Sequence, residues 1–277
     1  MARYAVVIPA YNEADYLPAT LSALRKAMAA VAAAHSGRVV VVDNHSTDDT
    51  AKVARENGAD EVVFEPVNQI SRARNAGARA AVTRGAEWLI FLDADTLVPP
   101  ETLARALAAL DSGAVCGGGA ITVCDGELPF FVRNFLTVWN WSAAKFGLAA
   151  GCFVYCTREG YEAAGGFSEA VYAGEEVWFS NRLRKWGRRG GLAFRVIARP
   201  PVVTSDRKTQ WFGGARFTLQ LAILLLFPFA ARWRRLCGLW YHRPSRDSAS
   251  ERVEPPDLPP GASPDRMIQN QTAPPPT

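Results

Sequence analysis

The chain of 277 residues carries a formal net charge of +4 and is 49% hydrophobic, which is enough apolar sequence for one large core. This mild basicity falls short of the dense basic stripe of a nucleic-acid-binding protein, so we expect no nucleic-acid partner. The five cysteines form no CxxC pair, which argues against a structural zinc site and favours reduced thiols in a cytoplasmic protein.

The first part of the chain alternates strand-like and helical patterns. Strands are predicted at residues 4–10, 38–44, 60–65 and 86–95, and helices at 17–31, 46–59, 71–85 and 99–110. Such alternation predicts an α/β fold with a mostly parallel sheet flanked by helices.

The pattern becomes less regular after residue 113. A strand is predicted at 113–124, with the GGG of residues 117–119 as a flexible turn, and residues 128–148 form an aromatic-rich helical stretch. Residues 151–167 suggest a strand, a short helix and a glycine turn. The next helix is predicted at 174–187, because carboxylates open it and a glycine closes it.

Acidic or polar groups follow three of the predicted parallel strands. They are Pro9 to Glu13, Asp43 to Ser46, and Asp93 to Asp95. Ligands bind where the carboxyl ends of parallel strands converge, so these groups together favour a binding site, although each alone could be a helix cap or a turn.

Asp93 and Asp95 stand one residue apart at the end of an apolar strand. Two carboxylates about 4 Å apart repel by ~4 kcal/mol at an effective dielectric constant of 20, so a positive group is expected beside them. A divalent cation with oxygen ligands, Mg²⁺ or Mn²⁺, fits best, and it implies a substrate that carries phosphate. The first strand is followed by no glycine-rich dinucleotide or P-loop motif, which disfavours hydride transfer and P-loop phosphoryl transfer.

Six stretches in this order resemble the family 2 glycosyltransferases of the GT-A fold over about residues 4 to 210. They are VVIPAYNEADYL, VVVVDNHSTDDT, ARNAG, FLDADT, GGF and GEEVWFSNRLRKWG. The resemblance implies a mixed, mostly parallel sheet and a nucleotide-diphospho-sugar donor. The QxxRW signature of processive synthases is absent, so the addition of a single sugar is expected.

The resemblance also implies roles for individual residues. The first-strand motif would line the nucleotide pocket, Asp43 would accept a hydrogen bond from the base, and the ARNAG arginine and asparagine would lie beside the ribose and diphosphate. Asp93 and Asp95 match the DXD motif that binds the metal and the donor diphosphate. The implied donor-binding residues are Pro9, Ala10, Tyr11, Glu13, Asp43, Arg72, Arg74, Asn75, Asp93, Ala94, Arg207 and Lys208. For Arg207 and Lys208 a solvated charge pair is an equal alternative.

Glu175 and Glu176 fall where the family usually has Glu-Asp, the second being the general base. Glu176 is therefore the expected base and Glu175 its rival, although Glu in place of Asp reaches one methylene further. The implied reaction is displacement at the anomeric carbon with inversion, on a saccharide or lipid-linked acceptor. The alternatives are a retaining transferase, a sugar-phosphate nucleotidyltransferase and a non-catalytic scaffold at the membrane.

Residues 217–231 are strongly apolar but shorter than the ~20 residues that span a bilayer. With the basic, aromatic residues that follow, they form either a helix packed on the catalytic domain or a contact with the inner face of the membrane. Residues 244–277 hold nine of the 18 prolines, which predicts disorder. The expected organisation is a catalytic domain at 1–210, an apolar and basic segment at 211–243, and a tail at 244–277.

Overall fold

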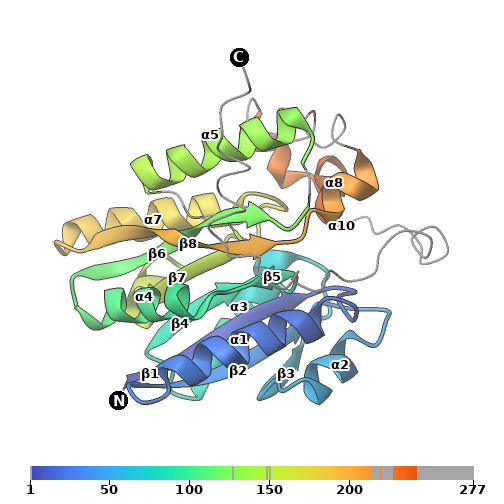
Figure 1. Ribbon diagram of the computed structural model, residues 1–277. Helices are drawn as coiled ribbons and strands as arrows, with labels where there is room; N and C mark the ends of the chain where they lie inside the picture. Colours follow the sequence, from blue (N-terminus) through green and yellow to red (C-terminus); the bar gives the residue numbers. More distant parts are fainter. Residues whose placement is uncertain are drawn as a thin grey trace.

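The protein is built on one twisted sheet of eight strands, seen in the computed structural model of Figure 1. The structure describes residues 2–126, 128–147, 149, 151–213, 219 and 227–241. The strand order is β3-β2-β1-β4-β7-β6-β8-β5. The strands are β1 Ala2–Ala10, β2 His35–Asp43, β3 Glu61–Phe64, β4 Trp88–Leu92, β5 Thr96–Leu97, β6 Val115–Cys124, β7 Phe153–Thr157 and β8 Ala193–Thr204.

The sheet is mixed but mostly parallel, as predicted. Strands β1 to β4 pair in parallel, β6 pairs in parallel with β8, and β7 and β5 each run antiparallel to their neighbours. Val6 to Ala10 and Val39 to Val42 are buried without polar alternation, because helices cover both faces.

Two hydrophobic cores lie on opposite faces of the sheet. One contains apolar residues of α1 (Leu17–Val31), α2 (Thr50–Glu56) and α4 (Pro100–Asp111). The other contains residues of α3 (Ile70–Thr83), α6 (Arg158–Ala163) and α7 (Glu175–Arg189). Pro18 and Pro100 lie in the first turns of α1 and α4, where no amide hydrogen is needed.

The glycines at 117–119 are not a flexible turn, and that expectation was wrong. They lie inside β6 and are buried between β7 and β8. A β-carbon on Gly118 would lie 1.8 Å from the carbonyl oxygen of Arg195, so a side chain at this position would prevent the pairing of β6 with β8. Strands β5 and β8 were not predicted at all.

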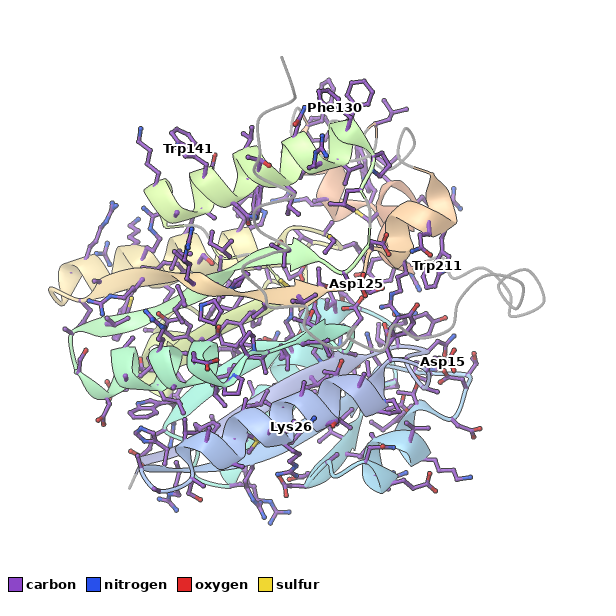
Figure 2. All side chains as sticks on the ribbon, in the orientation of Figure 1. Asp15, Lys26, Asp125, Phe130, Trp141 and Trp211 are labelled. Carbon is purple, nitrogen blue, oxygen red and sulfur yellow. The ribbon has the colours of Figure 1, made fainter. Side chains whose placement is uncertain are left out.

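Helix α5 (Phe130–Phe146) lies at the top of the molecule in Figure 1 and confirms the predicted aromatic-rich helix. It ends at Gly147, whose φ of 64° is left-handed. Phe130 and Trp141 project outward from it (Figure 2), and Phe131 is 70% exposed.

The C-terminal part of the chain is described from residue 227 to 241. It forms η1 (Pro228–Arg232), η2 (Arg234–Cys237) and α10 (Gly238–Tyr241), after the short α8 (Arg207–Phe212). Most of the predicted apolar helix at 217–231, and the whole predicted tail at 244–277, lie outside the described residues. In the part of the chain that the structure describes, no helix combines the length and apolarity needed to cross a bilayer.

Candidate functional site

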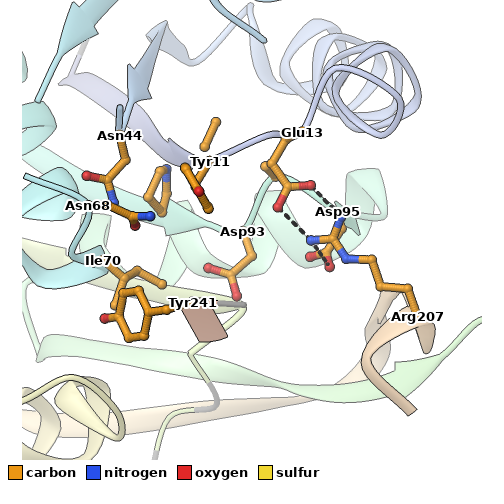
Figure 3. Close-up of a pocket in the computed structure, with 12 residues that line it drawn as sticks. Tyr11, Glu13, Asn44, Asn68, Ile70, Asp93, Asp95, Arg207 and Tyr241 are labelled. Atoms are coloured by element: carbon orange, nitrogen blue, oxygen red, sulfur yellow. Dashed lines mark hydrogen bonds and ion pairs between the residues drawn. The ribbon is translucent and has the colours of Figure 1, made fainter. Parts of the chain in front are cut away.

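A small cavity opens at the carboxyl ends of β1, β2 and β4 (Figure 3). It has a volume of about 60 Å³. Its described lining residues are Pro9, Ala10, Tyr11, Glu13, Asn44, Asn68, Ile70, Asp93, Ala94, Asp95, Arg207 and Tyr241. The first-strand motif and the DXD motif therefore meet at one place, as expected from their positions after the strands, and Arg207 joins them there.

The loop after β1 is held in position by side chains from the turn after β2 and from the first residue of α2. The hydroxyl of Thr50 accepts the amide hydrogen of Glu13 at 2.8 Å, and that of Ser46 accepts the amide hydrogen of Asn12 at 3.0 Å. Asn12 has a φ of 52°, which asparagine tolerates. The predicted helix at 46–59 begins only at Thr50, because the residues before it serve this loop.

Arg207 joins Glu13 to Asp95. Its guanidinium contacts the two carboxylate oxygens of Glu13 at 2.5 and 2.6 Å and Oδ2 of Asp95 at 2.9 Å. Burial by itself would lower the pKa of Arg207, but Asp95 and Glu13 more than offset it and hold the pKa above its ordinary value. The ring of Tyr16 lies 4.3 Å from this cation. Arg207 is thus charged, buried and fixed in place.

Arg74 makes a second, parallel bridge. Its side chain is 1% exposed, Nη1 contacts Glu175 at 2.6 Å, and Nη2 contacts Asp93 and the carbonyl oxygen of Gly151, both at 2.8 Å. Burial opposes its charge, but Asp93 and Glu175 raise its pKa above the ordinary value. Arg74 therefore ties the end of β4 to the start of α7, and each carboxylate of the DXD motif has its own arginine.

A second, larger cavity lies on the other side of the DXD motif. It has a volume of about 240 Å³, and Asp93 and Asp95 line both cavities. Its described lining residues also include Ile70, Arg74, Thr122, Cys124, Val132, Phe135, Leu136, Gly151, Cys152, Glu175, Glu176, Thr204, Ser205 and Asp206. The two acidic strand-end residues, together with Ile70, form the boundary between the two cavities.

Glu176 and Glu175 differ in their surroundings. Glu175 is buried and paired with Arg74. Glu176 is half-buried, and its carboxyl group lies against Gly151: a β-carbon added to Gly151 would be 3.2 Å from the carboxyl carbon of Glu176. Burial, and then the neighbouring Glu175 carboxylate, raise the pKa of Glu176 to about 8. Arg74 only partly offsets this rise, because the ion pair of Arg74 is with Glu175.

Three predicted donor residues line neither cavity. Asp43 accepts the amide hydrogen of Ser46 at 2.9 Å, and Arg72 pairs with Glu169 at 3.3 Å near the surface. Asn75 is buried and holds the GGF loop, donating to Phe167 O at 2.9 Å and accepting its amide hydrogen at 2.9 Å. The side chain of Lys208 lies outside the described part of the chain.

Several residues that line the first cavity were not among the implied donor-binding residues. Asn44 belongs to the Asp43 to Ser46 group expected after the second strand, whereas Asn68 follows β3, whose end was not considered as part of a site. Tyr241 had no strand-end signal, because it comes from α10. It packs there with Ala173 and Cys237, and Figure 3 shows it beside Ile70 on the wall opposite Arg207.

The charges of the site suit a divalent cation bound by few protein ligands. The two arginines are paired with four carboxylates, Glu13, Asp93, Asp95 and Glu175, so negative charge is in excess even without Glu176. Among the described residues, no three His, Cys, Asp or Glu side chains gather as a metal cage. Mg²⁺ commonly binds through only one or two carboxylates and takes its other ligands from water and phosphate, which Asp93 and Asp95 can satisfy.

Among curated proteins, the chain is similar to glycosyltransferases over part of its own length and part of theirs. An uncharacterised glycosyltransferase of Mycobacterium tuberculosis is 38% identical over 137 residues, 49% of this chain and 57% of the relative. The polyprenol monophosphomannose synthase of Mycolicibacterium smegmatis is 33% identical over 147 residues, 50% of this chain and 49% of the relative. The chain thus spans about half the length of the curated relatives it matches.

Comparison with solved structures supports the fold. The glucosyl-3-phosphoglycerate synthase of Mycobacterium tuberculosis, in complex with Mn²⁺, UDP and glucosyl-3-phosphoglycerate, superposes with a TM-score of 0.55 at 20% identity, covering 81% of this chain and 79% of that one. The predicted GT-A type fold is confirmed at this level, without the C-terminal apolar helix. The family model for glycosyl transferase family 2 matches residues 5–160, more than half of the sequence, and the chain belongs to the family 2 glycosyltransferases.

Proposed function

We propose that the protein transfers a sugar from a nucleotide-diphosphate donor to a hydroxyl acceptor, with inversion at the anomeric carbon. The observation that carries this proposal is the position of Asp93 and Asp95 between the two cavities. One cavity offers strand-end groups to a nucleotide, and the other holds Glu176. The bond from the anomeric carbon to the diphosphate would therefore break, and the bond from that carbon to the acceptor oxygen would form, beside Asp93 and Asp95.

The donor would bind on the side of Tyr11, Asn44 and Tyr241. At 60 Å³ this cavity is smaller than the ~300 to 1,000 Å³ of typical small-molecule sites, so its walls would part on binding. Asp93 and Asp95 would hold Mg²⁺ or Mn²⁺, which when bound offsets the negative charge that develops on the diphosphate leaving group. The Mn²⁺ and UDP present in the structure of the mycobacterial synthase support this assignment.

Glu176 would act as the general base. It lines the second cavity, its pKa is raised to about 8, and a carboxylate in hydrogen-bond reach of an acceptor hydroxyl can take its proton. Glu175 would be a positioning residue, because its carboxylate is held by Arg74 at 2.6 Å. We expected Arg74 and Asn75 beside the donor. In this proposal they act indirectly, because Arg74 holds the start of α7 at the end of β4 and Asn75 holds the GGF loop.

The catalytic unit would extend from residue 1 to about 210, since β8 ends at Thr204 and Arg207 follows it. The segment at 211–243 would add a wall to the donor cavity through Tyr241. We also propose that the protein works in the cytoplasm at the inner face of the membrane. The exposed Phe227, Phe229 and Trp233 beside three arginines, and the name of the polyprenol monophosphomannose synthase, support this location.

Donor binding and turnover can be tested together. Melting temperatures would be measured with UDP-, GDP- and dTDP-sugars, with and without Mn²⁺, and donor hydrolysis would be followed with the stabilising nucleotide. We expect one nucleotide class to stabilise the chain only with Mn²⁺, and Asp95→Ala to remove both effects. Pyrophosphate release from a nucleoside triphosphate would instead identify a nucleotidyltransferase, and the anomeric configuration of the product, read by NMR, would separate inversion from retention.

A further inference from the structure

The second cavity has an apolar wall and an acidic floor. The apolar wall is built by Ile70 of α3 and by Val132, Phe135 and Leu136 of α5, and the floor by the carboxylates next to Asp93. Its volume of about 240 Å³ exceeds that of a 150 Å³ cavity that can hold benzene, so a ring-sized group fits. We infer that this cavity takes an uncharged hydroxyl carried on an apolar body, the chemistry of a glycolipid, and excludes phosphate monoesters. This inference rests on the proposed function.

The charges that line the cavity disfavour an anionic acceptor. Besides Glu176, the described lining side chains include four acidic groups, Asp93, Asp95, Glu175 and Asp206, and one cation, Arg74. Both terminal nitrogens of Arg74 are already bonded to Asp93, Glu175 and Gly151. A phosphate monoester carries about −1.5 to −2 charges at pH 7 and would meet like charges. A dication bound with a nucleotide-diphosphate sugar adds no net positive charge to this space.

The proposed general base, Glu176, also favours a hydroxyl acceptor over a phosphate acceptor. A phosphate monoester oxygen is already ionised at neutral pH, because its second pKa is about 6, so it needs no proton acceptor. A sugar or alcohol hydroxyl does need one. In the step implied here the hydroxyl oxygen forms a bond to the anomeric carbon while its proton passes to Glu176, and the bond from that carbon to the diphosphate oxygen breaks with its electron pair. A general base at Glu176 is therefore needed for a hydroxyl acceptor and not for a phosphate acceptor.

The apolar wall continues to the outside of the molecule through α5. Its inner residues face the cavity, whereas Phe130, Phe131 and Trp141 of the same helix are exposed and project outward (Figure 2). Cations lie against this outer face, with Arg133 5.9 Å from the ring of Phe130 and Lys145 4.7 Å from that of Trp141. Aromatic rings with basic side chains suit the surface of an anionic bilayer. A lipid tail lying there could place its hydroxyl head in the cavity.

This acceptor differs from the one suggested by a relative. The polyprenol monophosphomannose synthase is named for a phosphate-linked product. That protein and this chain match over about half their lengths, so the acceptor side is free to differ.

Cys124 offers a direct measurement that requires neither donor nor turnover. It lines the cavity and is half-buried, whereas the other four cysteines are buried. Alkylation of the full chain by N-ethylmaleimide would be followed by mass spectrometry with octyl β-glucoside, octyl phosphate or glucose, each below the concentration at which micelles form. We expect octyl glucoside to slow the labelling of Cys124 at least fivefold, and octyl phosphate and glucose to leave it within twofold of the unliganded rate.

Equal protection by octyl phosphate, or no protection by octyl glucoside, would overturn the inference. Leu136→Arg serves as a matched variant, since a cation in the wall should give octyl phosphate a protective effect that it lacks on the unaltered chain. If a nucleotide and Mn²⁺ stabilise the chain while octyl glucoside gives no protection, the acceptor inference alone fails. If no nucleotide sugar stabilises the chain, the proposed function fails, whatever the labelling shows.

Discussion

Glu176→Gln should make the protein more stable at alkaline pH while removing its activity. Glu176 has an ordinary pKa of 4.5 in an unfolded chain and about 8 in the fold. Below pH 4.5 both states are protonated and the group contributes nothing to stability. Between pH 4.5 and 8 the unfolded chain has lost the proton and the folded one keeps it, so the free energy of unfolding falls as pH rises, and the whole penalty is present above pH 8.

The size of the effect follows from the shift. Each pKa unit corresponds to 1.36 kcal/mol, and since Glu176 is only half-buried we discount the total by more than half, to about 2 kcal/mol at pH 8.5. For a chain of this size that corresponds to a rise in melting temperature of about 4 to 8 °C. Glutamine is neutral at every pH and removes the penalty. Turnover should fall by about 10² to 10⁴, the usual contribution of a general base.

The measurement is a thermal melt at pH 5.5 and pH 8.5, in EDTA and without nucleotide, on the unaltered chain and on Glu176→Gln. Glu159→Gln is the control, because Glu159 also lies in the first turn of a helix but is exposed. We expect a gain for Glu176→Gln that is large at pH 8.5 and small at pH 5.5, and no such difference for the control. An equal shift at both pH values, or a loss at pH 8.5, would refute the electrostatic reasoning.

Three further predictions concern the supports of the site. Arg74→Met leaves Asp93 and Glu175 without their partner, so the free energy of unfolding measured in urea should fall by about 3 to 5 kcal/mol. Adding Glu175→Gln should recover part of this free energy, and no recovery would contradict the pairing. Arg207→Lys cannot make the two-pronged contact with the loop after β1, so we expect at least a tenfold weaker donor affinity by calorimetry with the charge retained. Gly118→Ala should prevent soluble expression or lower the melting temperature by more than 10 °C, because its β-carbon meets a carbonyl of β8; an unchanged melt would show that the strands can part.

The half of the fold built from parallel strands could be predicted from sequence because local patterns determine it. Buried runs such as Val39 to Val42 alternate with helices, and the parallel order brings the strand ends to one edge. The need for a positive group beside Asp93 and Asp95 also followed from elementary electrostatics. In the structure that group is a pair of arginines, Arg74 and Arg207, to which a cation would be added.

The other half depends on contacts that no local pattern encodes. Strand β8 is polar on one side and contains the Pro200–Pro201 pair, so its place between β6 and β5 results from tertiary pairing. Asn75 stands next to Arg74 in sequence, yet it faces the GGF loop and Arg74 faces the carboxylates. Tyr241 reaches the first cavity from a distant one-turn helix.

The stretch matched by the family model stops at residue 160, before the start of α7, the arginine that follows β8 and the tyrosine of α10. The matched stretch thus supplies the acidic doublet and the apolar wall from α5, whereas the remainder supplies Glu176, Arg207 and Tyr241. Such a division means that exchange of the chain from β7 onward would replace these groups together, with the doublet itself left as it is. Chimaeras between relatives, joined in the turn before β7, would be the natural way to exploit it.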